Sequence, residues 1–194
     1  MEEERVKSAF ELAMERISSL PELTAEEIAE QKEKQHGPLG EAAAGRYLNG
    51  SLSDDELTGE MGKYRGEQLA IVRRAALSSF CRALRLEGDP ETSAKALKGV
   101  GLIAPDKSSL VQRAAEDFGR LLGDFDRERR ERSAEFAPSV LKAFGVGGSA
   151  VRVNLPANER WLEELTMIRK AYEPGLEAVR SALMRELGDP PVPG

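Results

Sequence analysis

The stretch Trp161-Leu-Glu-Glu-Leu-Thr-Met-Ile-Arg-Lys-Ala-Tyr-Glu-Pro-Gly-Leu-Glu-Ala-Val-Arg-Ser-Ala-Leu-Met-Arg-Glu-Leu187 decides the fold class. Its large apolar side chains recur at steps of three and four residues, which places them on one face of an α-helix. Gly188-Asp-Pro190 ends the pattern, since proline cannot extend the hydrogen-bond ladder. We predict one long amphipathic helix that begins near Pro156 and is kinked at Pro174. The apolar stripe comprises Trp161, Leu165, Ile168, Tyr172, Leu176, Val179, Leu183 and Leu187.

The composition extends this prediction to the whole chain of 194 residues. Ala, Leu, Glu, Arg and Lys make up about half of the residues, and Thr and Ile are scarce. We therefore predict an all-α fold, an irregular helical bundle of about five to seven helices with long amphipathic faces. The only extended piece that we expect is Val151-Arg-Val153. The expected organisation is a single helical domain over residues 1–188, followed by a flexible Pro-rich tail over 189–194.

Caps and breakers divide the rest of the chain into predicted helices. Thr24-Ala-Glu-Glu27 and Ser53-Asp-Asp-Glu56 have the form of capping boxes, in which a hydroxyl and a carboxylate each satisfy a backbone N–H group. Gly62 and Gly66 favour either close contact with another helix or a break near residues 59–66. The predicted helices cover residues 3–18, 24–37, 39–48, 54–86, 91–98 and 106–135, with Gly37-Pro38 ending the second and a turn over 99–105 preceding the last.

The formal net charge of -6 disfavours a general nucleic-acid binder, because such proteins need a surplus of Lys and Arg to neutralise phosphates. No apolar run has the length of a signal peptide, and none approaches the roughly 20 residues that cross a bilayer. We expect a cytoplasmic protein without a membrane partner. Cys81 is the only cysteine, which rules out a disulfide within the chain and a thiolate zinc cluster.

Few residues offer catalytic or metal-binding chemistry. Glu33-Lys-Gln-His36 has the spacing found in di-iron carboxylate bundles, but that site needs the motif twice and His36 is the only histidine. We interpret His36 as a helix C-terminal residue near free carbonyl groups. We predict no transition metal and no cofactor, while an all-carboxylate magnesium or calcium site stays open. Cys81 has no evident base, which favours a buried thiol over a nucleophile.

A basic stretch is the strongest charge signal. Residues 63–85 contain one acid, Glu67, whereas residues 1–35 hold ten acidic and five basic side chains. One interpretation is that the two segments pack within one chain and their rims pair. The other is that the basic face meets an acidic protein partner or, as a weak contact, RNA or the ribosome. The candidate face consists of Lys63, Arg65, Arg73, Arg74, Arg82 and Arg85.

The opening Lys7-Ser-Ala-Phe-Glu-Leu-Ala-Met-Glu-Arg16 resembles the start of a family of short, uncharacterised bacterial helical proteins. Those proteins begin with a similar Lys-Ser-Ala-x-Glu-x-Ala-x-Glu stretch. The resemblance implies a bacterial cytoplasmic protein. Because the family has no assigned activity, the resemblance transfers no functional residue to this chain.

We expect a non-enzymatic, helix-mediated interaction or scaffold protein that self-associates as a homodimer. The expected seam consists of Val6, Phe10, Ile17 and Leu20, which share one narrow helix face. The long stripe from Trp161 to Leu187 is the second expected dimer surface, since a compact core of this size rarely hides such a length. The alternative is that the terminal helices cover each other within one chain. A second function hypothesis is a small-ligand-binding protein or enzyme with a pocket of acids and arginines between helices.

Overall fold

The computed structural model describes residues 8, 24–143, 145 and 153–188, and this part of the chain is all-α, as predicted. It contains helices and no strand. The predicted helix over 3–18, the extended piece except Val153, and the tail over 189–194 lie outside the described residues. The helices are α2 (Ala25–Leu48), α3 (Asp54–Met61), α4 (Gly66–Ala83), α5 (Pro90–Ile103), α6 (Ser108–Ala143) and α7 (Glu159–Leu187), with 3-10 turns η1 (Pro105–Lys107) and η2 (Leu155–Ala157).

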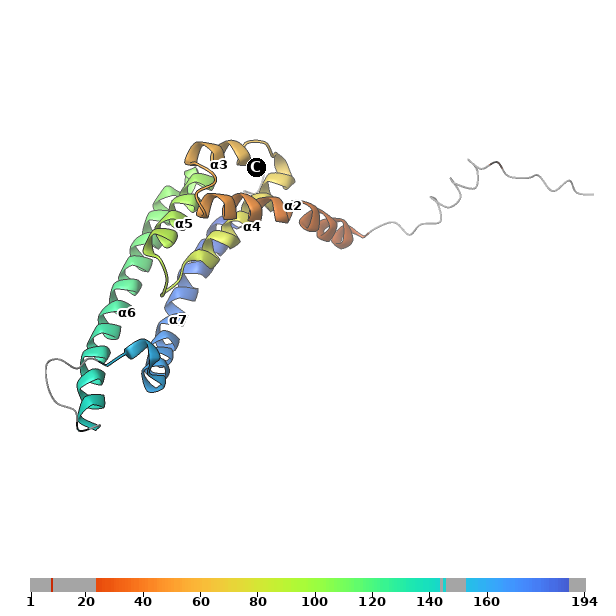
Figure 1. Cartoon of the computed structure of the whole chain (residues 1–194). Helices are drawn as coiled ribbons and strands as arrows, with labels where there is room; N and C mark the ends of the chain where they lie inside the picture. The colour runs from red at the N-terminus through yellow and green to blue at the C-terminus, as the bar shows by residue number, and fades with distance from the viewer. Residues whose placement is uncertain (1–7, 9–23, 144, 146–152, 189–194) are drawn as a thin grey trace, which may run out of the picture.

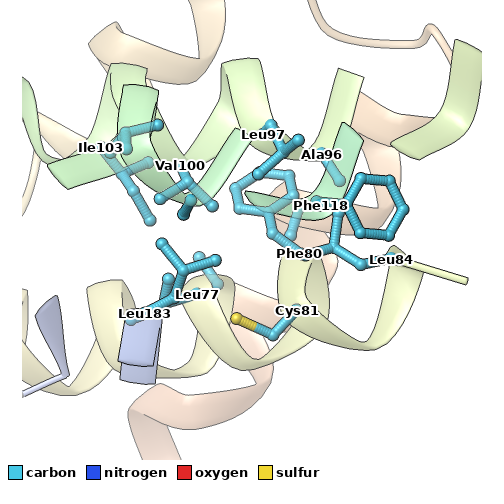
Figure 2. Close-up of a cluster of buried hydrophobic side chains, with 14 of the residues drawn as sticks. Leu77, Phe80, Cys81, Leu84, Ala96, Leu97, Val100, Ile103, Phe118 and Leu183 are labelled. Carbon is cyan, nitrogen blue, oxygen red and sulfur yellow. The ribbon is translucent and has the colours of Figure 1, made fainter. Parts of the chain in front are cut away.

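Helix α4 is the centre of the arrangement, because it contacts α2, α5 and α7. Figure 1 shows α6 and α7 running side by side as a long hairpin, with α2 to α5 gathered at one end. The core lies where α4 meets its neighbours. There, side chains from four helices point toward one another (Figure 2): Leu77 and Phe80 of α4 with Leu84 just after it, Leu97, Val100 and Ile103 of α5, Phe118 of α6 and Leu183 of α7.

The stripe of α7 is buried within the chain. Trp161, Ile168 and Leu183 are at most 6% exposed, because α6 and α4 cover this face. The ring of Phe125 on α6 meets that of Tyr172 edge-on at 5.6 Å between centroids, and Phe136 lies 5.5 Å from Trp161. The expectation that this stripe needs a second copy to cover it was therefore wrong: the hairpin partner supplies the cover.

Helix α2 does not end at Gly37-Pro38 as predicted. It continues through Pro38 to Leu48 and merges the two predicted helices over 24–37 and 39–48. Proline lacks the N–H for one helical hydrogen bond, a cost of about 3 kcal/mol in a helix interior. The residues that follow, Ala43, Ala44 and Tyr47, are buried against the bundle. Their burial holds the helix together across the proline.

The predicted helix over 54–86 is divided in two. Helix α3 ends at Met61 and α4 begins at Gly66, which has a φ of 54°, a left-handed conformation that favours glycine. The break near residues 59–66 is thus the correct interpretation of the glycine pair. In α5, by contrast, the predicted turn is helical as far as Ile103: Gly99 packs directly against the ring of Phe80, and Val100 and Ile103 are buried in the core. Helix α6 likewise continues past the predicted end at residue 135 to Ala143.

Candidate functional site

The structure divides the predicted basic face. Arg74 pairs with Glu33 at 3.0 Å and Arg82 with Glu41 at 2.8 Å, so both arginines join α4 to α2. Lys63 pairs with Glu60 within its own turn at 2.5 Å. These three cations already have acidic partners in the same chain. The acidic α2 and the basic α4 do pack together, as the first of the two interpretations expected.

The other three cations of that face differ from one another. Arg65 donates to the backbone carbonyl oxygens of Gly62 and Tyr64, and so stabilises the turn between α3 and α4. Arg85 lies beyond the end of α4 and lines a separate, charged pocket. Arg73 lines an apolar pocket, and its Nε atom is buried without a hydrogen-bond partner. The six residues therefore form no single surface.

The apolar pocket, here called the α4 groove, has a volume of about 930 Å³. It is enclosed by α2, α4, the corner between α5 and η1, and the C-terminal end of α7. Its apolar lining includes Leu69, Ile71 and Leu77 of α4, Ile103 of α5 and Leu187 of α7. Arg73, Arg74, Glu33, Glu67, Asp106, Lys107 and Glu186 supply its charged lining. A concave, largely apolar site of this size, with a few polar groups, is the usual form of a small-molecule site.

Two atoms of the groove are short of hydrogen-bond partners. Within the described residues, the buried side-chain nitrogen and oxygen atoms without a partner are the Nε atoms of Arg73 and Arg74, and both residues line this groove. A buried donor on a charged group that finds no acceptor costs free energy, so native chains rarely leave one unsatisfied. Arg74 still reaches Glu33 through Nη1. Arg73 is the arginine of the groove that has no acidic partner among the described residues.

The charged pocket, of about 810 Å³, lies between α7 and the loop after α4. Arg169 donates from Nε to Glu87 at 2.8 Å. Arg180 donates to the carbonyl oxygens of Cys81 at 3.0 Å and Leu84 at 2.5 Å, at the C-terminal end of α4. Arg169 joins α7 to the loop after α4, and Arg180 joins it to the C-terminal end of α4, where carbonyl groups lack the usual helical donors. These hydrogen bonds explain the arginines of this pocket as residues that stabilise the fold.

The residues that the sequence suggested for catalysis, His36 and Cys81, line neither the α4 groove nor the charged pocket. His36 stands in the middle of α2, contrary to the prediction of a helix end, and its Nδ1 lies 3.3 Å from Nε2 of Gln68. Cys81 is buried, as predicted, and burial raises the pKa of its thiol to about 11. The thiol is therefore protonated at neutral pH and a poor nucleophile. Among the described residues, no three His, Cys, Asp or Glu side chains cluster as metal ligands.

One side of α2 exposes large apolar side chains. Ile28 is 41% exposed and Leu39 is 42% exposed. They are eleven residues apart, close to three full helical turns, so they point in nearly the same direction. That direction differs from the side that holds Tyr47 and Gly40 against the bundle. The predicted seam Val6, Phe10, Ile17 and Leu20 precedes α2 in the chain and lies outside the described residues.

The sequence did not identify the α4 groove, because its lining comes from four segments that only the fold brings together. The adjacent pair Arg73-Arg74, which follows the apolar run Leu69 to Val72, was the one available signal. No helix of the described part is long and apolar enough to span a bilayer. Comparisons with protein-family models, curated proteins and solved structures found no match.

Proposed function

We propose that this protein is a non-catalytic, helix-mediated interaction protein that pairs with a second copy of itself in the bacterial cytoplasm. The observation that supports it is the outward side of α2, where Ile28 and Leu39 stand exposed and aligned. Helices that face solvent on one side normally place polar residues there. Two aligned apolar side chains on such a side are typical of a surface that another helix covers.

Chain order supports a second copy as the partner. The predicted seam Val6, Phe10, Ile17 and Leu20 precedes α2 in the sequence, so two apolar patterns follow one another along the chain. In a two-fold dimer each copy presents the same patch to the other, so one apolar patch on each chain is enough to form the interface. The stripe of α7, which is buried in its own chain, takes no part in this interface.

Light scattering on the purified full chain tests the proposal. We expect a species of twice the 21.2 kDa chain mass at micromolar concentration. Phe10→Asp with Ile17→Asp, and separately Ile28→Asp with Leu39→Asp, should each give the mass of a single chain. Leu162→Asp is the matched control, because Leu162 is similarly exposed, at 46%, but lies on α7. It should leave the dimer intact.

Circular dichroism should show that each variant keeps its helices. A single-chain mass for the unmodified protein would refute self-association, and a dimer that persists in both double variants would refute this interface.

An acidic protein or RNA bound at the predicted basic face is disfavoured as the main partner, since Lys63, Arg74 and Arg82 are ion-paired within the chain. Salt-dependent retention of the protein on a polyanion column would favour that partner instead.

A further inference from the structure

We propose that the α4 groove binds a small amphipathic carboxylate, with the carboxylate on Arg73 and the apolar chain along Leu69, Leu77 and Ile103. This site is separate from the self-association surface on the outward side of α2. The proposal therefore stands or falls independently of the dimer.

The shape of the groove supports an apolar body for the ligand. Its volume of about 930 Å³ is large enough for a medium-length acyl chain or a substituted aromatic ring. Leu77 and Ile103 are almost fully buried, and Leu69 is half-buried, so they form the base of the groove rather than an exposed patch. An apolar chain placed there removes its own surface, and the exposed part of Leu69, from water.

The charge of Arg73 supports the carboxylate. Arg74 has Glu33 at 3.0 Å and Lys32 has Glu67 at 2.5 Å, so these two acids of the groove are occupied. No ion pair joins Arg73 to an acid within the described part of the chain, and its Nε lacks an acceptor. A guanidinium presents parallel N–H donors that match the two oxygens of a carboxylate. Arg73 supplies this match beside an apolar wall.

The other charges of the described lining include no second unpaired guanidinium. Asp106 and Lys107 are neighbours on η1 and carry opposite charges, and Glu186 lies 3.4 Å from the Arg185 Nε atom. The groove thus offers one unpaired guanidinium, where a phosphate or dicarboxylate site would gather several. A monocarboxylate with an apolar chain fits both the single unpaired guanidinium and the apolar lining of the groove.

Isothermal titration calorimetry of the full chain with dodecanoate, below its micelle-forming concentration, tests the proposal. We expect saturable binding of one equivalent. Dodecan-1-ol, which has the chain without the charge, and acetate, which has the charge without the chain, should each bind at least tenfold more weakly. Equal binding of dodecanoate and dodecan-1-ol, or no binding of dodecanoate, would overturn the proposal.

Variants then locate the site. Arg73→Gln should weaken dodecanoate binding about tenfold or more, which is the loss expected when a charge-assisted hydrogen bond is removed, and should leave dodecan-1-ol binding unchanged. Arg85→Gln is the matched control, because Arg85 belongs to the charged pocket, and it should bind as the unmodified chain does. Glu33→Gln frees Arg74 and should tighten binding. Arg73→Gln with unchanged affinity for dodecanoate would place the binding elsewhere and refute the assignment.

The two proposals fail separately. The Ile28→Asp and Leu39→Asp double variant should bind dodecanoate with the affinity of the unmodified chain, because neither of these described residues lines the groove. Loss of dodecanoate binding in that variant, with helix content retained, would contradict an independent groove site.

Discussion

Gly40 of α2 lies directly against the backbone of Val72 in α4, so close that a methyl group at Gly40 would overlap the Val72 carbonyl oxygen. The two helices approach this closely because Gly40 has no side chain and its neighbours Ala43 and Ala44 have small ones. This crossing fixes the distance between α2 and α4. It therefore also fixes one wall of the α4 groove, which Ala29 and Glu33 supply from the same helix.

Gly40→Ala should destabilise the protein by about 1–3 kcal/mol, the usual cost of forcing a group into a filled space. Gly45→Ala is the control, because a side chain there meets no atom within 4 Å. It should stabilise α2 by up to about 1 kcal/mol through helix propensity alone. Urea unfolding followed by circular dichroism measures both. Equal effects of the two substitutions would show that the helices do not cross at Gly40.

Arg180→Gln should lower the free energy of unfolding by about 1.5–3 kcal/mol, since two carbonyl oxygens at the end of α4 lose a charged donor. Arg185→Gln is the control on the same helix. Its side chain is 74% exposed and reaches only the neighbouring Glu186, so its effect should be near zero. Thermal unfolding of the two variants separates the outcomes, and an Arg180→Gln protein as stable as the control would contradict this role.

Ser53→Ala should cost about 1 kcal/mol, the typical loss for an N-cap side chain. The Ser53 hydroxyl oxygen accepts from the Glu56 N–H at 3.3 Å, and the Glu56 carboxylate accepts from the Ser53 N–H at 2.8 Å. Ser51→Ala should have little effect, because Ser51 contributes its backbone N–H to Asn49. Chemical denaturation compares the two. A larger loss for Ser51→Ala than for Ser53→Ala would contradict the cap.

Stability should fall as the pH rises above about 9. Burial raises the pKa of Cys81 from 9.0 to about 11. Burial, with the hydrogen bond to Asp54, raises the pKa of Tyr47 from 10.0 to about 12. Both groups hold their protons more tightly in the folded state, so their contribution is complete below the unfolded pKa and is lost as pH rises through the folded one.

Urea unfolding at pH 8, 9.5 and 11 measures this loss, and Cys81→Ala isolates the contribution of the thiol. The variant is less stable at pH 8 because it loses packed volume, but its stability should decline less between pH 9 and 11. Parallel declines for the two proteins would show that the Cys81 thiol ionises equally easily in the folded and unfolded states. Tyr47→Phe should show the corresponding difference between pH 10 and 12.

Sequence patterns predicted the structure correctly where the residues that produce it all lie within one short segment. The capping boxes at Thr24 and Ser53 formed as predicted, because each needs only residues three positions apart. The stripe of α7 turned inward because its spacing defines one helix face. The all-α fold followed from many such segments.

Signals that depend on a neighbouring helix failed. Pro38 and Gly99 are helix breakers by propensity, yet both lie inside helices, since α2 is buried against the bundle beyond Pro38 and Gly99 receives the ring of Phe80. His36 was assigned to a helix end for the same reason. For the candidate site, the arginines could be identified from the sequence, but which of them are ion-paired could not.

The sequence by itself determined that this protein is helical, where most apolar faces lie and which turns are capped, because period and capping chemistry act over three or four residues. Only the tertiary structure decided which apolar faces find cover within the chain and which charges find partners. The stripe of α7 is covered by α6 and α4, while Ile28 and Leu39 stay exposed. Arg74 meets Glu33 across two helices, and its neighbour Arg73 meets no acid among the described residues. Pairings of this kind depend on residues some forty positions apart, whose distance is set by the packing of backbones such as Gly40 against Val72.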